Sequence, residues 1–240
     1  MKPVGRLSKS LAFGVVLGAV LSVYSAQAAT GRAVVRSVSG TASYAEQGGE
    51  WKPLKSGQAL GPGATVKTAV DGSVDLFLGD NGPDVHLFDS TTLGLDRLNL
   101  EQTGADRVVE TQLNLTAGTI RGTVKKMSAA SKYEVKTPNA VVGVRGTKYQ
   151  ISANGVVHVI EGSMVVVYIN PSTQQMSTHT VGSGQTFVPP VNPGAPGATP
   201  TVRPTRDGEV IDIRGKGTEE LPLVSAPQPE VFVSPIRPND

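Results

Sequence analysis

The chain has 240 residues, of which 38% are hydrophobic and 18% charged, and its formal net charge is +2. It contains no cysteine, and this excludes thiolate nucleophiles, Cys-ligated zinc and redox motifs. A chain of this length can bury a hydrophobic core without disulfide cross-links.

The first 28 residues have the pattern of a secretory signal peptide. Basic side chains lie within residues 2–9, an apolar stretch covers 11–23, and Ala26 and Ala28 form a small-x-small cleavage pattern. The apolar stretch is short for a bilayer span, which needs about 20 residues; an uncleaved N-terminal anchor is the alternative. Cleavage after Ala28 would remove three of the 22 basic residues and none of the 20 acidic ones, leaving a formal charge of −1. The sequence therefore predicts export to a bacterial periplasm or cell surface, without the positive charge that attracts nucleic acid.

Residues 30–188 have the pattern of short β-strands separated by turns. Apolar and polar residues alternate in 73–78, 112–115 and 119–124, and Gly-, Asp- and Asn-containing turns separate such runs. Residues 93–109 are ambiguous between strand and helix. The spacing predicts an all-β fold, a single domain that is irregular β-solenoid-like or sandwich-like.

Residues 189–240 are rich in proline and glycine. Proline removes backbone donors, and few large apolar residues offset the entropy of ordering this segment. We therefore expect a largely disordered tail. The runs 210–213 and 231–233 are short exceptions that could add a strand or dock on a partner.

The sequence offers little for catalysis or metal binding. The three histidines, His86, His158 and His179, match no metal-ligand spacing, and residues 80–84 lack the oxygen spacing of a calcium loop and suit a turn instead. Paired carboxylates for glycoside chemistry need no sequence signature, but the aromatic content is only 5%. We expect no catalytic residue, no cofactor, no metal and no enzymatic activity.

Trp51 is the single tryptophan. It could be a surface binding platform or a lid over one end of the core. The lid is the favoured interpretation, because a lone indole normally buries most of its area.

Two motifs stand out in the predicted β-domain. Residues 57–68 read Gly-x-x-Leu-x-x-Gly-x-x-Val-x-Thr, and residues 137–147 read Thr-Pro-x-Ala-x-x-x-Val-Arg-Gly-Thr. Together they resemble the FecR domain family over about residues 34–188. The resemblance implies an exported, all-β, non-enzymatic domain. Members of the iron-dicitrate type are membrane-spanning regulators between a TonB-dependent receptor and an extracytoplasmic-function sigma factor.

This chain departs from those regulators in two places. Ten residues precede the apolar segment, so the sequence predicts no cytoplasmic anti-sigma region, and the proline-rich tail stands where the regulators carry a C-terminal lobe. We therefore expect this chain to share the FecR-like domain of those regulators, whereas the resemblance does not extend to their control of a sigma factor.

The second motif also has a physical interpretation. Pro138 is expected to end a strand after Thr137, and Gly143 and Gly146 would allow close backbone approach or positive φ. Arg145 is expected to be half-buried against Glu161, with a structural role, because a buried guanidinium needs an anion or several carbonyls. The predicted structural residues of this motif and the following tight turn are Thr137, Pro138, Gly143, Arg145, Gly146, Thr147, Glu161 and Gly162.

These observations favour a non-enzymatic binding or scaffold module of the cell envelope, whose partner is an envelope protein or a glycan. The alternative is a periplasmic signal-relay component linked to sigma-factor or iron-type regulation. An envelope glycan-processing enzyme is a distant third. Membrane proximity is expected only through an uncleaved signal segment.

Overall fold

The structure is a computed structural model that describes residues 29–103 and 106–210. The predicted signal peptide with Ala26 and Ala28, the run 231–233 and most of the tail lie outside the described residues. The described part consists of β-strands and one short 3-10 turn, η1 (Gly79–Asn81), and no α-helix is assigned in it. It holds no helix with the length and apolar character needed to cross a membrane. The prediction of an all-β fold is confirmed.

The strands form two large sheets around one hydrophobic core. In spatial order, the first sheet contains β17 (Met176–Gly182), β16 (Ser163–Ile169), β13 (Ala140–Val144), β12 (Lys132–Thr137), β10 (Asp106–Ala117), β9 (Thr92–Thr103), β6 (Ala64–Thr68), β3 (Ala42–Glu46) and β4 (Lys52–Pro53), with β1 (Ala29–Thr30) paired to β9. The second contains β19 (Thr201–Pro204), β18 (Gln185–Val188), β15 (Val157–Glu161), β14 (Lys148–Ser152), β11 (Thr119–Thr123), β8 (Asp84–Leu87), β7 (Ser73–Phe77), β2 (Ala33–Ser39) and β5 (Ala59–Leu60).

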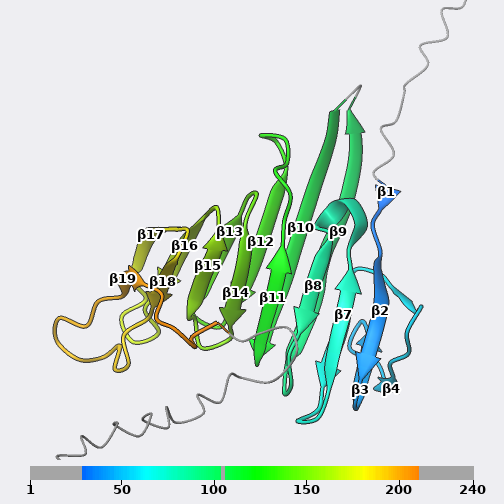
Figure 1. The fold of residues 1–240 in the computed structure, drawn as a ribbon, viewed down its shortest axis with the longest axis horizontal. Helices are drawn as coiled ribbons and strands as arrows, with labels where there is room; N and C mark the ends of the chain where they lie inside the picture. The colour runs from blue at the N-terminus through cyan, green and yellow to red at the C-terminus, as the bar shows by residue number, and fades with distance from the viewer. Residues whose placement is uncertain (1–28, 104–105, 211–240) are drawn as a thin grey trace, which may run out of the picture.

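The chain advances along the molecule as it builds both sheets. Figure 1 shows the N-terminal strands in blue at one end and the C-terminal strands in yellow and orange at the other. Paired strands are antiparallel throughout, except for β10 and β12, which are parallel. The fold therefore combines the two layers of a sandwich with the progressive winding of a solenoid.

Aromatic side chains join the two sheets at the centre of the core. Tyr133 on β12 and Tyr149 on β14 are fully buried, and their hydroxyl oxygens lie 3.0 Å apart in a hydrogen bond across the core. Tyr168 on β16 packs against Phe187 on β18 with ring centroids 6.1 Å apart. Each pair takes one ring from each sheet, so these contacts fix how the sheets stack.

The ambiguous region 93–109 forms most of a long hairpin, β9–β10, which extends beyond the neighbouring strands (Figure 1). Leu95 and Leu98 are both fully buried although they are three residues apart. The strand register shifts between them, where Gln112 of β10 pairs with Arg97 and Leu113 pairs with Leu95. A β-bulge of this kind gives a strand the i, i+3 apolar spacing of a helix, and this explains the ambiguity.

The second sheet continues past Val188, the predicted end of the domain. Residues 201–204 form β19, which pairs with β18 through Gln185↔Pro204 to Val188↔Thr201. Arg203 then forms two hydrogen bonds, of 2.9 and 2.5 Å, with the carboxylate of Glu209. The sequence did not predict this strand because the segment is rich in proline. Proline is nevertheless acceptable in an edge strand, which needs no hydrogen-bond donor on its outer side.

Candidate functional site

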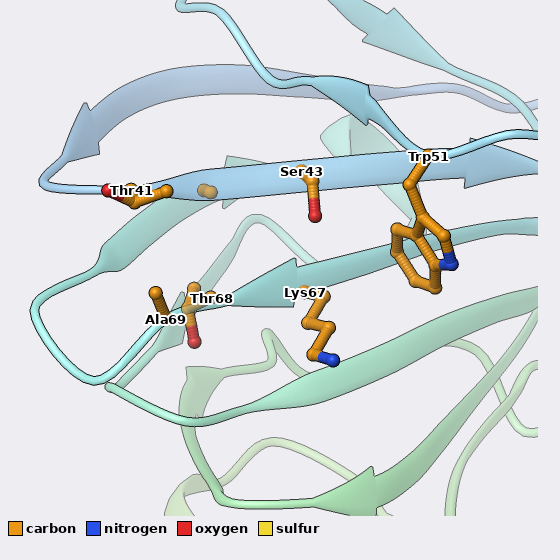
Figure 2. A pocket seen from close by; sticks show the side chains of 7 residues that line it. Thr41, Ser43, Trp51, Lys67, Thr68 and Ala69 are labelled. Carbon is orange, nitrogen blue, oxygen red and sulfur yellow. The ribbon is translucent and has the colours of Figure 1, made fainter.

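A shallow pocket lies beside Trp51 at the N-terminal end of the first sheet. It has a volume of about 190 Å³ and is lined by β3 and β6 and by the residues around them. Figure 2 shows the indole ring projecting from the chain just before β4, alongside Ser43 and Lys67. The other lining residues are Thr41, Ala42, Thr68 and Ala69.

Trp51 is 51% exposed, so the expectation that it covers the core is wrong. Pairing of β4 with β3 places Lys52 opposite Tyr44 and Pro53 opposite Ser43. Leu54, the next residue, enters the core with 6% exposure, and its N–H donates to the Ala42 carbonyl at 3.0 Å. The smaller leucine therefore closes this end of the core and leaves the indole on the surface.

The pocket offers an aromatic face next to hydrogen-bonding groups. Lys67 is exposed and forms no ion pair within the described part of the chain, and Ser43 presents its hydroxyl on the same side (Figure 2). An exposed indole gives a large contact area at low entropic cost, and the flanking polar groups would orient a ligand. Such a surface suits the apolar face of a sugar ring or a peptide side chain.

The motif of residues 137–147 forms a corner between the two sheets. Strand β12 ends at Thr137, directly before Pro138, and β13 returns beside it in the first sheet. The chain then crosses through Arg145 and Gly146 to β14 in the second sheet. Gly146 has φ of +63°, which favours glycine.

Arg145 does not take the place expected for it. It is exposed, and its Nη2 donates to the Met127 carbonyl at 3.3 Å. Glu161 instead forms an ion pair with Lys148 at 2.7 Å, because the β14–β15 register places these two residues opposite each other. The prediction of a half-buried Arg145–Glu161 pair is therefore wrong.

Thr147 is the buried polar residue at this corner. Its hydroxyl lies 2.8 Å from the Ser163 carbonyl and 3.1 Å from the Arg145 carbonyl, and its backbone exchanges two hydrogen bonds with Val124. Gly162, with φ of +90°, packs so closely that a Cβ there would lie 2.5 Å from the Gly146 carbonyl oxygen. These contacts join the corner to the turn between β15 and β16.

Gly143 has neither of the properties expected for it. Its φ is not positive, and the nearest atom to an added Cβ would be the Val165 carbonyl oxygen at 3.8 Å, an ordinary contact. The close approach lies at Gly122, which the sequence did not single out.

A row of polar side chains crosses the outer face of the second sheet, and sequence reasoning missed it. Strand pairing places its members in consecutive register across eight strands: Ser37, Asp75, His86, Arg121, Gln150, His158, Thr186 and Arg203. Four of them, Asp75, His86, Gln150 and His158, each lie between two buried apolar neighbours in their own strands. Only the register, which single-strand patterns do not reveal, brings them into one line.

At one end of this row, Asp75 accepts hydrogen bonds from Ser37 at 2.5 Å and from Nδ1 of His86 at 2.7 Å. Burial raises the pKa of Asp75, but these hydrogen bonds outweigh it, so the pKa is lowered overall and the carboxylate stays ionised. These residues line a groove of about 420 Å³ together with Arg36 and Arg121. In a nucleophilic triad the histidine bridges serine and aspartate, whereas here the aspartate bridges the other two. The arrangement lacks the contact that would activate Ser37.

At the other end of the row, the C-terminal segment covers His158. Nδ1 of His158 lies 2.8 Å from Thr186 Oγ1, which in turn lies 2.8 Å from Thr205 Oγ1. Burial lowers the pKa of His158. His179 lies elsewhere, against the ring of Phe187. Within residues 29–103 and 106–210, no group of three His, Asp or Glu side chains could hold a metal ion.

The fold and these surfaces define an all-β domain with two sheets, a glycine-containing corner and surface pockets. Residues 64–165 match the family model described as FecR protein, so this part of the chain is similar to a FecR domain. The match runs from the start of β6 into β16 and contains the whole second motif, but it is narrower than the 34–188 expected from the sequence. No curated protein matches the chain.

Proposed function

We propose that this protein is a non-enzymatic binding module of the bacterial cell envelope, and that its ligand contacts the surface around Trp51. The exposed indole beside Ser43 and Lys67 is the observation that carries the proposal. A glycan is the favoured partner, because a flat aromatic face flanked by hydroxyl and ammonium groups can bind both the apolar face and the hydroxyls of a sugar ring.

Export to the envelope is part of the proposal and rests on the signal-peptide pattern of residues 1–28. Cell fractionation and the intact mass of the purified protein test it. A mature chain that begins after Ala28 in the periplasmic fraction supports export. A full-length chain in the cytoplasm contradicts it.

The binding test uses Trp51 itself, because it is the only tryptophan and its fluorescence reports on this pocket. Soluble peptidoglycan fragments are titrated into the wild-type protein and into Trp51→Ala, the latter by calorimetry. Met176→Ala is the control, since Met176 is an exposed apolar residue at the opposite end of the molecule. We expect a fluorescence change and a loss of at least tenfold in affinity in Trp51→Ala alone. Binding without a fluorescence change, or no binding by the wild type, would contradict a glycan site at Trp51.

Signal relay is the second candidate, and the FecR domain is the observation that favours it. Its test is capture of partners from envelope extracts by the exported protein. Recovery of a receptor plug domain, independent of Trp51, would favour relay over the glycan-binding module.

A further inference from the structure

A group of basic side chains gathers around the connection between β11 and β12, away from the Trp51 pocket. Arg107 comes from β10, Lys125 and Lys126 from the connection itself, and Arg145 from the motif corner. Nη2 of Arg145 donates to the Met127 carbonyl, and the backbone of Lys126 packs against Gly146. Three segments that are separate in the sequence therefore bring positive charge to one place.

This charge is only partly compensated. Asp80 lines the same cavity and forms an ion pair with Arg107. Lys125, Lys126 and Arg145 are exposed, and in the part of the chain that the structure describes none of the three forms an ion pair.

Unpaired cations occur elsewhere in the described residues too, Lys67 among them, but four basic residues on other strands are neutralised. Arg36, Arg97, Lys148 and Arg203 each pair with a carboxylate. The three unpaired cations therefore form a local excess of positive charge on a chain whose formal charge is only +2, or −1 without residues 1–28.

Lys125 and Lys126 line a polar cavity of about 270 Å³, and Arg145 is bonded to the carbonyl of Met127, another residue that lines it. Ser128 and Ser131 line it, with their hydroxyl oxygens 2.8 Å apart, and Ser131 Oγ accepts a hydrogen bond from the Val109 N–H at 3.0 Å. These bonds hold the connection against β10, so the lysines are presented from a fixed backbone. Arg145 uses one of its five N–H donors on Met127, and the others remain able to bind an anion.

We propose that this basic corner, formed by Lys125 and Lys126 at the cavity and by Arg145 held beside it through the Met127 carbonyl, binds a phosphate group. The site explains why the arginine of the motif is exposed rather than buried: the guanidinium is oriented by one backbone carbonyl and faces a ligand. In the envelope the phosphate could belong to a lipid headgroup or be free in solution, and both present the same anionic oxygens. The site is separate from the Trp51 surface and does not depend on it.

The test compares the wild-type chain with the triple variant Lys125→Gln, Lys126→Gln, Arg145→Gln. The matched control is Arg32→Gln, Lys52→Gln, Lys55→Gln, which removes the same charge from three exposed residues elsewhere. Binding is measured by sedimentation with vesicles of phosphatidylglycerol, with vesicles of phosphatidylcholine, and by calorimetry with inorganic phosphate. Thermal denaturation verifies that all three proteins are folded.

We expect the wild type and the control to bind phosphatidylglycerol vesicles or inorganic phosphate, and not phosphatidylcholine vesicles. Each basic residue near an anionic surface contributes about fivefold to affinity, so the triple variant should bind about 100-fold more weakly. Binding to anionic vesicles alone assigns a lipid headgroup, and competition by inorganic phosphate assigns a free anion. The proposal is overturned if the wild type binds neither probe, if the triple variant binds as well as the wild type, or if the control loses as much affinity. Trp51→Ala should leave this binding unchanged, which separates it from the glycan test.

Discussion

Replacement of Gly122 by alanine should destabilise the fold through a single contact between neighbouring strands of the second sheet. Gly122 on β11 pairs with Tyr149 on β14, and the phenol ring lies over the position that a side chain would occupy. A Cβ added there would lie 2.4 Å from the Tyr149 hydroxyl oxygen and 2.5 Å from Cζ. Real Cβ atoms do not approach other atoms so closely, so the ring must move.

Movement of the ring has two costs. Overpacking of a core costs about 1–3 kcal/mol. The displaced ring also loses its hydrogen bond to Tyr133, and a buried hydroxyl left without a partner costs about 1–3 kcal/mol more. Alanine has less conformational entropy than glycine in the unfolded chain, and this offsets about 0.4–1 kcal/mol of the loss. We expect a net loss of about 1–6 kcal/mol in the free energy of unfolding.

Gly143→Ala is the matched control. Gly143 is also a strand glycine with an ordinary φ, but an added Cβ would meet nothing closer than 3.8 Å. It should be neutral or stabilise the protein by up to about 1 kcal/mol. Urea denaturation followed by circular dichroism measures both variants, with unchanged m-values as the test of two-state behaviour.

The double variant Gly122→Ala, Tyr149→Leu tests the cause. If the clash with the ring is responsible, the two substitutions should be less destabilising together than the sum of their separate effects. A Gly122→Ala protein as stable as Gly143→Ala, or strictly additive effects, would refute the reasoning.

Three further predictions concern the corner and the C-terminal segment. Thr147→Val should lower the free energy of unfolding by about 1–2 kcal/mol, because it removes the buried hydroxyl that donates to the Ser163 carbonyl. Arg145→Met should change the free energy of unfolding by less than about 0.5 kcal/mol, because Arg145 is exposed. Equal losses for the two variants in urea denaturation would contradict the buried role of the threonine. The ion pair between Arg203 and Glu209 lowers the pKa of Glu209 to about 2, so the stability that this pair contributes is complete above pH of about 4.5 and is lost as the pH falls towards 2. Hydrogen exchange of the β19 amides should accelerate over this pH range in the wild type, and it should already be fast at neutral pH in Glu209→Gln. Burial lowers the pKa of His158, so the unfolded chain binds the proton more readily and the stability of the protein should fall as the pH drops below about 6.5. Between pH 7.5 and 5 the denaturation midpoint should therefore change less in His158→Gln than in the wild type. Identical pH profiles of the two proteins would count against this burial effect.

Local sequence patterns were sufficient for the fold class. Strict alternation in runs such as 73–78 and 119–124 has a period of two, and such a run can bury one face only as a strand. The two motifs identified the domain for a similar reason, since Gly146 occupies a backbone conformation that other residues rarely adopt. The β9–β10 hairpin stayed ambiguous because a bulge, which is a property of strand pairing, altered the spacing of its leucines.

The candidate sites depended on facts that no local pattern contains. Trp51 was expected to cover the core, but the smaller Leu54 fills that place once β4 pairs with β3. Arg145 was assigned to Glu161, but the register of β14 and β15 places Lys148 opposite Glu161. In both cases a residue type indicated a need for burial or for a partner, and the sequence could not tell which neighbour would meet it.

The sequence by itself determined the all-β fold of the described residues and the similarity of residues 64–165 to a FecR domain, because backbone periodicity and glycine conformation are local properties. Only the tertiary structure decided which side chains meet. Strand register aligned eight polar residues from separate strands in one row, and the packing of the two sheets placed two tyrosine hydroxyls together across the core. Register depends on long-range pairing across two sheets, and a shift of one residue would move every one of these side chains to the opposite face.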